Sequence, residues 1–335
     1  MLIKGKIAII ISIIFGFVII ASIPVVILSS SFSPYIKIEH YKSFEYTSLN
    51  SSTIEEINLN VDVGDIEISY TYAPVDYHVK VEVFINMSGQ NLPGKSYLDY
   101  FKAPVWKNST NSAIFSMELL SESWFDTSLW ITRDVSIIVT LNANILFDIN
   151  TTTNLEGNVK VYVPGGVNVN NVNVIINKLN NKTVSKSLIY FDYCTIEGNI
   201  TANGNFADIE LKTINVQYIQ NSILNLSNDE GILTFDIIQY EEMGANITGI
   251  LNSTTGHVHL IYQDYTQNVG AWIKMIDFLG WGHSDSTSEG FYEDVSKPSG
   301  REFVSYDFPA KNNYNFSMYT GFWHDIAYLW KLYNK

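Results

Sequence analysis

The sequence predicts an all-β protein: a β-solenoid, in which short strands coil and stack, preceded by one N-terminal transmembrane helix. Three observations lead to this prediction: a 22-residue run without charge near the N-terminus, alternation with period two over most of the remaining chain, and short motifs that recur 24 and 25 residues apart. A β-sandwich is the alternative fold, because two antiparallel sheets packed face to face show the same alternation.

The uncharged run extends from Ile7 to Leu28. As a helix it would be about 33 Å long, enough to cross the hydrocarbon core of a bilayer. Lys4 and Lys6 precede it, and no Lys or Arg follows before Lys37. Because positive charge stays in the cytoplasm, we expect a single-pass protein of the cell membrane with a cytoplasmic N-terminus and an extracellular C-terminal domain. The lipid bilayer is then one expected partner.

Two other interpretations of this segment stay open. It could be a secretory signal that is cleaved near Ser29–Ser31, although its apolar run is longer than that of most such signals. Alternatively, Lys4-Gly5 before the run resembles the processing site of archaeal pilin-type signal peptides. That resemblance would imply a subunit of a surface filament.

The whole chain can be divided into four parts by composition. Residues 1–28 form the cytoplasmic tip and transmembrane helix, and residues 29–50 form a stalk. Residues 51–270 form the extracellular β-repeat domain, with an insertion at about 88–133 that contains Trp106, Trp124 and Trp130. Residues 271–335 contribute a loop and aromatic C-terminal strands that cap the domain. Strand-like alternation is clearest at Asn58–Val63 and at Val79–Phe84.

A weak repeat supports the solenoid. Five strands begin with glycine or alanine followed by apolar residues at every second position; they start at Gly64, Gly157, Ala207, Gly231 and Gly256. The last three lie 24 and 25 residues apart, which suits one coil of a stack. We therefore expect the first apolar residue of each motif to belong to one continuous interior, namely Ile66, Val159, Ile209, Leu233 and Val258.

The C-terminal region departs from the period-two alternation. Val269–Leu279 is the one candidate helix outside the N-terminal run. Aromatic side chains then crowd the end of the chain, and we expect them to cover the open end of the last coil, with contact to a glycan or protein as the alternative; they are Trp323, Tyr328, Trp330 and Tyr333.

Several of these motifs resemble the prokaryotic putative-adhesin β-strand repeat family, a domain of unknown function. The resemblance lies in Val159–Val167, with its Pro164-Gly165 step, in Val63–Ile68 and in Thr254–Leu260. Tyr314–Gly321 resembles the closing repeat. The resemblance implies an all-β repeat fold and surface adhesion, and it transfers no catalytic residue. The insertion at about 88–133 departs from the family pattern.

Composition excludes several function classes. The formal net charge of −14 argues against a nucleic-acid partner, which requires a basic face. Cys194 is the only cysteine, so neither an intrachain disulfide nor a cysteine-based zinc site can form. No cofactor is expected.

Candidate catalytic and metal sites are weak. His257 and His259 lie on one face of an expected strand, about 7 Å apart, but lack a third ligand nearby in sequence. Gly282–Ser286 resembles a nucleophile elbow only superficially, because its fifth residue is serine instead of glycine. Four acidic residues of the following segment lack the spacing of a calcium loop; they are Asp285, Glu289, Glu293 and Asp294. We expect no catalytic and no metal residue.

Candidate N-glycosylation acceptors are more frequent than chance. Ten N-x-S/T motifs occur, about twice the number expected from the composition, and all lie on the side predicted to be external. They are Asn50, Asn86, Asn108, Asn150, Asn181, Asn199, Asn225, Asn246, Asn252 and Asn315.

The sequence thus predicts a membrane-anchored cell-surface protein that acts as an adhesin, an envelope component or a ligand-contact protein, without catalysis. A surface protein or a glycan is the expected partner. The main rival is a carbohydrate-active enzyme on a β-helix, in which Asp65, Asp208 and Asp236 would converge on one face. The filament subunit is the second rival.

Overall fold

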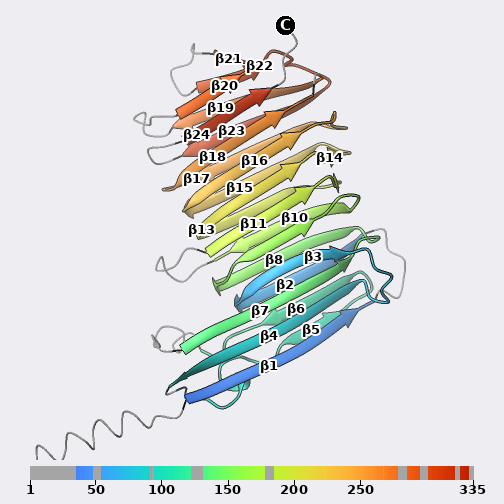
Figure 1. Ribbon diagram of the computed structural model, residues 1–335, viewed down its shortest axis with the longest axis vertical. Helices are drawn as coiled ribbons and strands as arrows, with labels where there is room; N and C mark the ends of the chain where they lie inside the picture. Colours follow the sequence, from blue (N-terminus) through green and yellow to red (C-terminus); the bar gives the residue numbers. More distant parts are fainter. Residues whose placement is uncertain are drawn as a thin grey trace, which may run out of the picture.

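The computed structural model describes residues 35–47, 54–90, 92, 94–121, 131–177, 185–266, 268–277, 285–294, 301–320 and 325–331. These residues form strands joined by turns, and the only helical element among them is the 3-10 turn η1 (Tyr97–Asp99), capped by the side chain of Ser96. The strands stack into an elongated body with β1 at one end and the C-terminal strands at the other (Figure 1).

The strands fall into two sheets. Sheet A contains, in spatial order, β1 (Tyr35–Tyr46), β4 (Val79–Gln90), β7 (Ile131–Asn142), β3 (Asp65–Thr71), β9 (Val159–Val163), β11 (Ser185–Asp192), the C-terminal part of β13 (Ile200–Ile214), β16 (Ile232–Gln239), β18 (His257–Asp264), β24 (Asp325–Lys331) and β20 (Asp285–Glu289).

Sheet B contains β5 (Val105–Asn108), β6 (Ser112–Met117), β2 (Glu55–Val63), β8 (Phe147–Glu156), β10 (Asn168–Ile176), the N-terminal part of β13, β15 (Ser222–Glu230), β17 (Ile247–Ser253), β23 (Asn312–Thr320), β19 (Val269–Asp277), β22 (Arg301–Ser305) and β21 (Phe291–Asp294). The short strands β12 (Thr195–Ile196) and β14 (Gln217–Tyr218) extend it beside β10.

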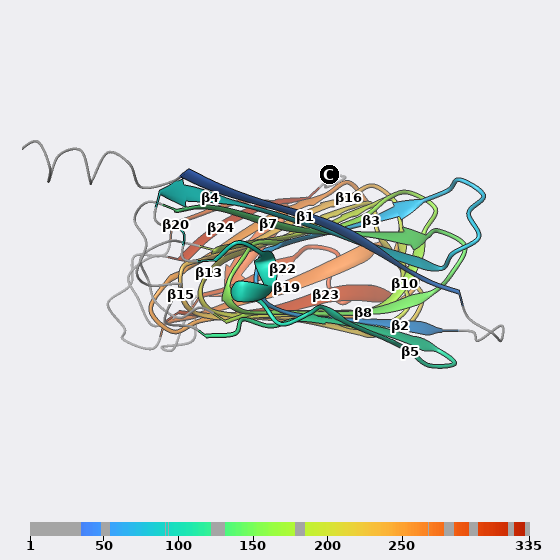
Figure 2. The same cartoon turned by 90° about the horizontal axis from the view of Figure 1, so that it is seen from below.

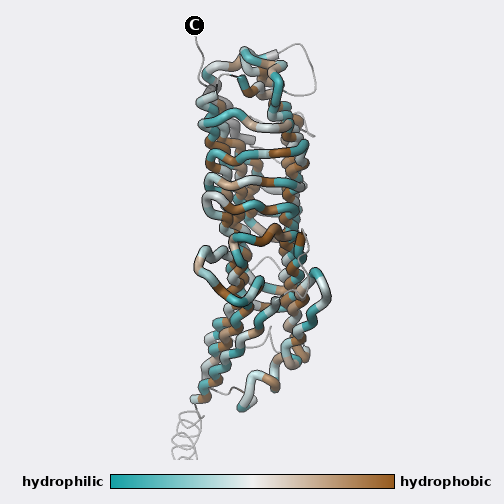
Figure 3. Tube along the Cα trace, turned by 90° about the vertical axis from the view of Figure 1, so that its right-hand side faces the viewer, coloured by the Kyte–Doolittle hydropathy of each residue, from teal (hydrophilic) through white to brown (hydrophobic). Residues whose placement is uncertain are grey.

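In each repeat the chain crosses from sheet B to sheet A and then back to sheet B. One strand in sheet B is followed by one in sheet A, as in β15–β16 and β17–β18, and β13 passes through both sheets without a break. Strands of successive repeats pair in parallel. Seen from the end, the two sheets face each other across one core (Figure 2), and the side view shows the repeats stacked one above another (Figure 3).

The corner from sheet B to sheet A leaves no room for a Cβ at Gly231 and Gly256. Gly231 has a φ of +123°, and a Cβ built there would lie 2.5 Å from the carbonyl oxygen of Ala207. A Cβ at Gly256 would lie 1.9 Å from the carbonyl oxygen of Gly231. The backbones of successive repeats therefore touch at this corner, which explains why the repeat motif begins with glycine or alanine.

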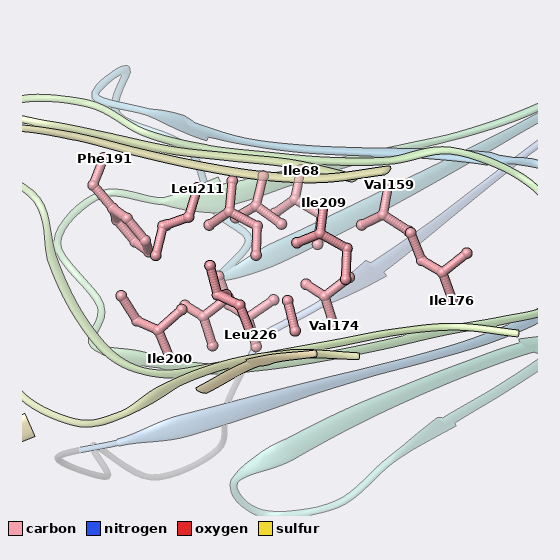
Figure 4. Packing of buried hydrophobic residues seen from close by; sticks show 14 of the residues in the cluster. Ile68, Val159, Val174, Ile176, Phe191, Ile200, Ile209, Leu211 and Leu226 are labelled. Carbon is pink, nitrogen blue, oxygen red and sulfur yellow. The ribbon is translucent and has the colours of Figure 1, made fainter. Parts of the chain in front are cut away.

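The expected interior is confirmed. The register places Ile66 beside Val159, Ile209 beside Leu233, and Leu233 beside Val258. All five side chains are at most 1% exposed. Figure 4 shows Val159 and Ile209 pointing from sheet A toward residues of sheet B. Ser187 occupies the same column, between Val159 and Ile209, and is also buried.

Both ends of the stack depart from chain order. At the C-terminal end, β23 lies between β17 and β19, and β24 lies between β18 and β20. At the N-terminal end, β2 lies between β6 and β8, and β3 lies between β7 and β9. Antiparallel strands then finish the ends, with β1 and β4 beside β7 and with β22 and β21 beside β19.

The predicted fold class, a β-solenoid preceded by one N-terminal transmembrane helix, is wrong as stated. No helix among the described residues is long and apolar enough to cross a membrane. The run Ile7–Leu28 that led to this prediction lies outside those residues. The β-sandwich alternative fits the described part, because two sheets pack face to face around one core, although most of their strands are parallel.

Three segments differ in detail from the sequence-based description. The expected helix Val269–Leu279 is a strand over Val269–Asp277 (β19), because its alternate side chains pack into the core between parallel and antiparallel neighbours. Residues 35–46 of the expected stalk form β1, which pairs with β4 along its full length. The expected insertion contains β5 and β6, and Trp106 packs against Phe44 with ring centroids 5.6 Å apart.

Candidate contact surface

The outward face of sheet B carries two neighbouring columns of uncharged side chains. Because strand residues alternate between the two faces, every second residue of seven adjacent strands points outward. The first column is Asn58, Asn150, Asn173, Thr201, Asn225, Ile250 and Ser317. The second column is Asn60, Thr152, Ile175, Asn203, Ser227, Asn252 and Tyr319. We call these fourteen residues the polar strip, and none of them is ionisable at neutral pH.

Much of the hydrogen-bonding capacity of the polar strip is unused. Asn150 donates to Glu56 (3.0 Å), Asn60 accepts from Asn154 (2.8 Å), and Ser227 donates to Asn203 (2.5 Å). Seven other side chains make no hydrogen bond with any residue that the structure describes; they are Asn58, Thr152, Asn173, Thr201, Asn225, Asn252 and Ser317. Their amides and hydroxyls are half-buried beside their neighbours and remain able to donate and to accept.

A ladder of asparagines fixes the strands along one edge of the polar strip. Asn199 donates its backbone N–H to the Asn171 side chain, and its own Oδ1 accepts the N–H of Ile223, both at 2.8 Å. In the next repeats, the Oδ1 of Asn246 accepts the N–H of Asn313 at 2.8 Å. Each side chain thus satisfies a backbone donor of the following repeat, so that the spacing of the strands is fixed by side chains as well as by the sheet.

The candidate glycosylation acceptors gather on the same sheet. Asn50 and Asn181 lie outside the described residues. Asn86 lies on β4 of sheet A and is exposed. The others lie on sheet B strands or directly before them; they are Asn108, Asn150, Asn199, Asn225, Asn246, Asn252 and Asn315.

Strand geometry alone accounts for part of the excess of these motifs. The asparagine and the hydroxyl of an N-x-S/T motif are two residues apart, which puts both on one face of a strand. A face rich in Asn, Ser and Thr, such as the polar strip, therefore creates the motif frequently. Use of these asparagines for glycosylation remains a prediction.

Sheet A presents a different outward face. Tyr162 and Tyr190 lie on adjacent strands with ring centroids 5.4 Å apart, and burial raises the pKa of Tyr190. The ammonium group of Lys212 lies 5.9 Å from the centre of the Tyr190 ring and 3.4 Å from a carboxylate oxygen of Asp236. Charged and aromatic side chains pair with each other here, which distinguishes this face from the polar strip.

The three carboxylates proposed for an enzyme do not converge. Asp65 accepts the backbone N–H of Asn158 at 2.8 Å, and Asp208 accepts that of Ile232 at 2.9 Å. Asp236 lies in another column and pairs with Lys212. Each carboxylate thus stabilises its own pair of repeats.

The two histidines lie side by side, as expected for one strand face. The ring centroids of His257 and His259 are 6.4 Å apart. Burial and the neighbouring His257 lower the pKa of His259. In the described part of the chain, no group of three His, Cys, Asp or Glu residues could hold a metal ion.

The remaining candidates are scattered. Ser284 of the elbow-like motif lies outside the described residues. Asp285 is the first residue of β20, and Asp294 is the last residue of β21. Glu289 is exposed. Glu293 forms a bidentate pair with Arg301, at 2.6 and 3.0 Å, and the Arg301 hydrogen bond lowers the pKa of that carboxyl.

Sequence reasoning missed a polar cleft of about 270 Å³ at the glycine corner. It is lined by Arg133 among acidic side chains, and the guanidinium lies 3.9 Å from Glu156. Asp65 and Asp134 complete the acidic lining. The cleft joins residues that are distant in sequence, so no local motif marks it.

Neither a protein-family profile nor a curated protein matches the chain. Two solved structures resemble it weakly. One is described as a putative cell adhesion protein from Clostridium sporogenes, with 12% identity and a TM-score of 0.37, over 87% of this chain and 99% of that one. The other is described as a putative lipid binding protein from Parabacteroides distasonis, with 11% identity and a TM-score of 0.28, over 88% and 97%.

A likeness at these TM-scores does not bear on function. The similarity to the putative-adhesin repeat family, noted from the motifs, stays a resemblance.

Proposed function

We propose that this chain is a non-catalytic contact protein of the cell surface, which binds its partner through the polar strip. The observation that carries the proposal is the continuity of the strip: seven adjacent strands present neutral donors and acceptors in register, and half of these side chains have no partner within the described protein.

The shape supports a contact role. The strip follows the long axis of the stack, from β2 near the β1 end to β23 near the C-terminal end (Figure 1). A body attached through its N-terminus would carry such a strip outward from the attachment point. Extracellular placement of the described domain is part of the proposal.

Two arguments favour contact over catalysis. Hydrolysis of a glycoside needs two carboxyl groups that flank the bond at a set separation. Asp65, Asp208 and Asp236 are each engaged within the sheet, in different repeats. The polar strip contains no carboxyl, imidazole or amino group, so its chemistry is suited to recognition.

Contact can be tested with intact cells of the source organism. We expect external protease to remove the described domain, and full protection of it would contradict the surface location. Attachment of cells to one another or to their own envelope material should fall when Thr201 and Asn225 are both replaced by Lys, because two charges then interrupt the strip. Thr234→Lys, on the outward face of sheet A, is the matched control and should attach normally.

A further inference from the structure

We propose that the polar strip binds a linear neutral polysaccharide that lies along the axis of the stack, with Trp272 as a stacking residue at the C-terminal end. This inference rests on the proposed contact function and names its ligand class. Its steps concern the charge of the strip, its dimensions, its rigidity and the aromatic side chain at its end.

Charge selects a neutral ligand. The chain carries a formal net charge of −14, yet none of the fourteen residues of the strip is charged at neutral pH. Acidic side chains flank it instead, with Glu56 and Asp148 on one side and Asp62 on the other. Lys274 of β19 lies beside Ser317 at the C-terminal end of the first column, and its ammonium group is 4.0 Å from a carboxylate oxygen of Glu302. An anionic polymer would be repelled by these flanks and would find no cation in the strip. A neutral ligand is not repelled by the acidic flanks and needs no cation in the strip.

The dimensions select an elongated ligand. Seven strands at a spacing of about 4.8 Å make the strip roughly 29 Å long, and two columns two residues apart make it about 7 Å wide. Such a narrow surface suits one extended chain and not a globular protein, whose interfaces are broader. Sugar hydroxyls donate and accept hydrogen bonds, as do the amides of Asn173 and Asn225 and the hydroxyl of Thr201.

The strip is already organised before binding. Its residues lie in the middle of paired strands, and the asparagine ladder through Asn199 and Asn246 holds successive repeats together at one edge. Preorganised side chains lose little freedom on binding, which matters when each hydrogen bond contributes little by itself.

An aromatic ring lies next to the C-terminal end of the strip, one outward position before the first column. Trp272 lies beside Asn315 in the register of β19 and β23, and its side chain is 37% exposed. Its indole N–H donates to Glu302 at 3.4 Å, and Phe308 lies against it with ring centroids 6.3 Å apart. The ring is thus held in place while one side stays open, and it offers an apolar surface for the C–H face of a sugar.

The test uses the full chain and a panel of neutral polysaccharides: cellulose, chitin, mannan, arabinoxylan and dextran. Polygalacturonate serves as the anionic probe. We expect the chain to bind at least one neutral polymer, to retain binding in about 1 M salt because no ion pair is involved, and to leave polygalacturonate unbound. The inference would be overturned if the chain bound polygalacturonate but no neutral polymer, or if it bound no member of the panel. Loss of binding to the neutral polymer in high salt would also overturn it.

Variants locate the site. Asn173→Ala with Asn225→Ala and Asn252→Ala should weaken binding about tenfold or more, with an unchanged unfolding midpoint because all three side chains point outward. Trp272→Ala should weaken it separately. Thr234→Ala on sheet A is the control. Equal binding by all variants would place the ligand elsewhere, and glycans found by mass spectrometry on Asn225 and Asn252 of the native protein would show the strip to be covered.

The two proposals can fail separately. If cells attach through the strip but no neutral polysaccharide binds, the ligand class is wrong and the contact function stands. If the Lys variants attach normally, the contact function itself fails.

Discussion

At the scale of single residues, many polar side chains in this fold hydrogen-bond to neighbouring repeats as well as facing solvent. Asparagine is frequent because its side chain serves three positions. It accepts backbone donors along a ladder, as at Asn199; it occupies the outward polar strip, as at Asn225; and it fits the left-handed corner at Asn215, where φ is +47°. The acceptor motifs are partly a consequence of this use.

A first prediction concerns buried hydroxyls. Thr153 is fully buried between β2 and β10, and its Oγ1 has no hydrogen-bond partner. Thr153→Val keeps the shape and removes the unpaired hydroxyl, so we expect the free energy of unfolding to stay unchanged or to rise by about 1 kcal/mol. Urea unfolding measures it. Ser253→Ala is the contrast: its buried Oγ accepts the Gly256 N–H at 3.0 Å, and its loss should cost about 1–3 kcal/mol. Equal effects would refute the distinction.

A second prediction concerns the buried Glu55 and its partly exposed partner His78. Glu55 is 1% exposed, and both of its carboxylate oxygens lie within 2.9 Å of the His78 Nδ1. His78→Ala leaves the buried Glu55 carboxylate without this hydrogen bond and should cost about 3 kcal/mol, whereas Glu55→Ala should cost less because the His78 side chain is 22% exposed. The double variant should cost clearly less than the sum, as a double-mutant cycle in urea would show. Additive losses would mean that the pair is not coupled.

At the scale of strands, alternation and glycine made much of the fold predictable. Period two identified most strands and the buried column from Ile66 to Val258, because one sheet face must be apolar. The pattern failed at β19, where bulky residues such as Trp272 and Met275 are compatible with a helix and only the pairing with β23 and β22 decides for a strand. The polar strip could not be predicted from the sequence for a related reason. Alternation shows which residues share a face, but it does not show which strands are neighbours.

A third prediction tests the glycine corner. Gly256→Ala would place its Cβ 1.9 Å from the carbonyl oxygen of Gly231, so the two repeats must separate locally. We expect a loss of about 2 kcal/mol or more in the free energy of unfolding. Gly165→Ala is the matched control at the opposite corner, where the nearest atom would lie at an ordinary 3.5 Å, and it should change stability by about 0.5 kcal/mol or less. A tolerant Gly256 would show that the repeats are not in contact there.

For the whole molecule, the unexpected feature is the order of the end repeats. Nothing in the local sequence of β23 and β24 indicates that they insert one repeat inward, because their alternation would also suit the outermost position. Insertion makes them partners of two repeats at once: Phe316 pairs with Gly249 on one side and with Ile273 on the other. The C-terminal segment therefore joins the outer repeat to the rest of the stack, whereas an outermost strand would only have covered it.

This arrangement leads to a fourth prediction. Ending the chain before Asn312 removes β23 and β24, and with them the strands to which β19 and β20 are paired. We expect β19 to β22 to lose protection from hydrogen exchange together, and β17 and β18 to become exposed edges, while β8 to β11 stay protected because their own neighbours are intact. Tyr328→Ser, an exposed position on β24, is the control and should leave the protection pattern unchanged. If β19 instead kept its protection in the shortened chain, it would have paired directly with β17, and the inserted strands would not be what holds the outer repeat in place.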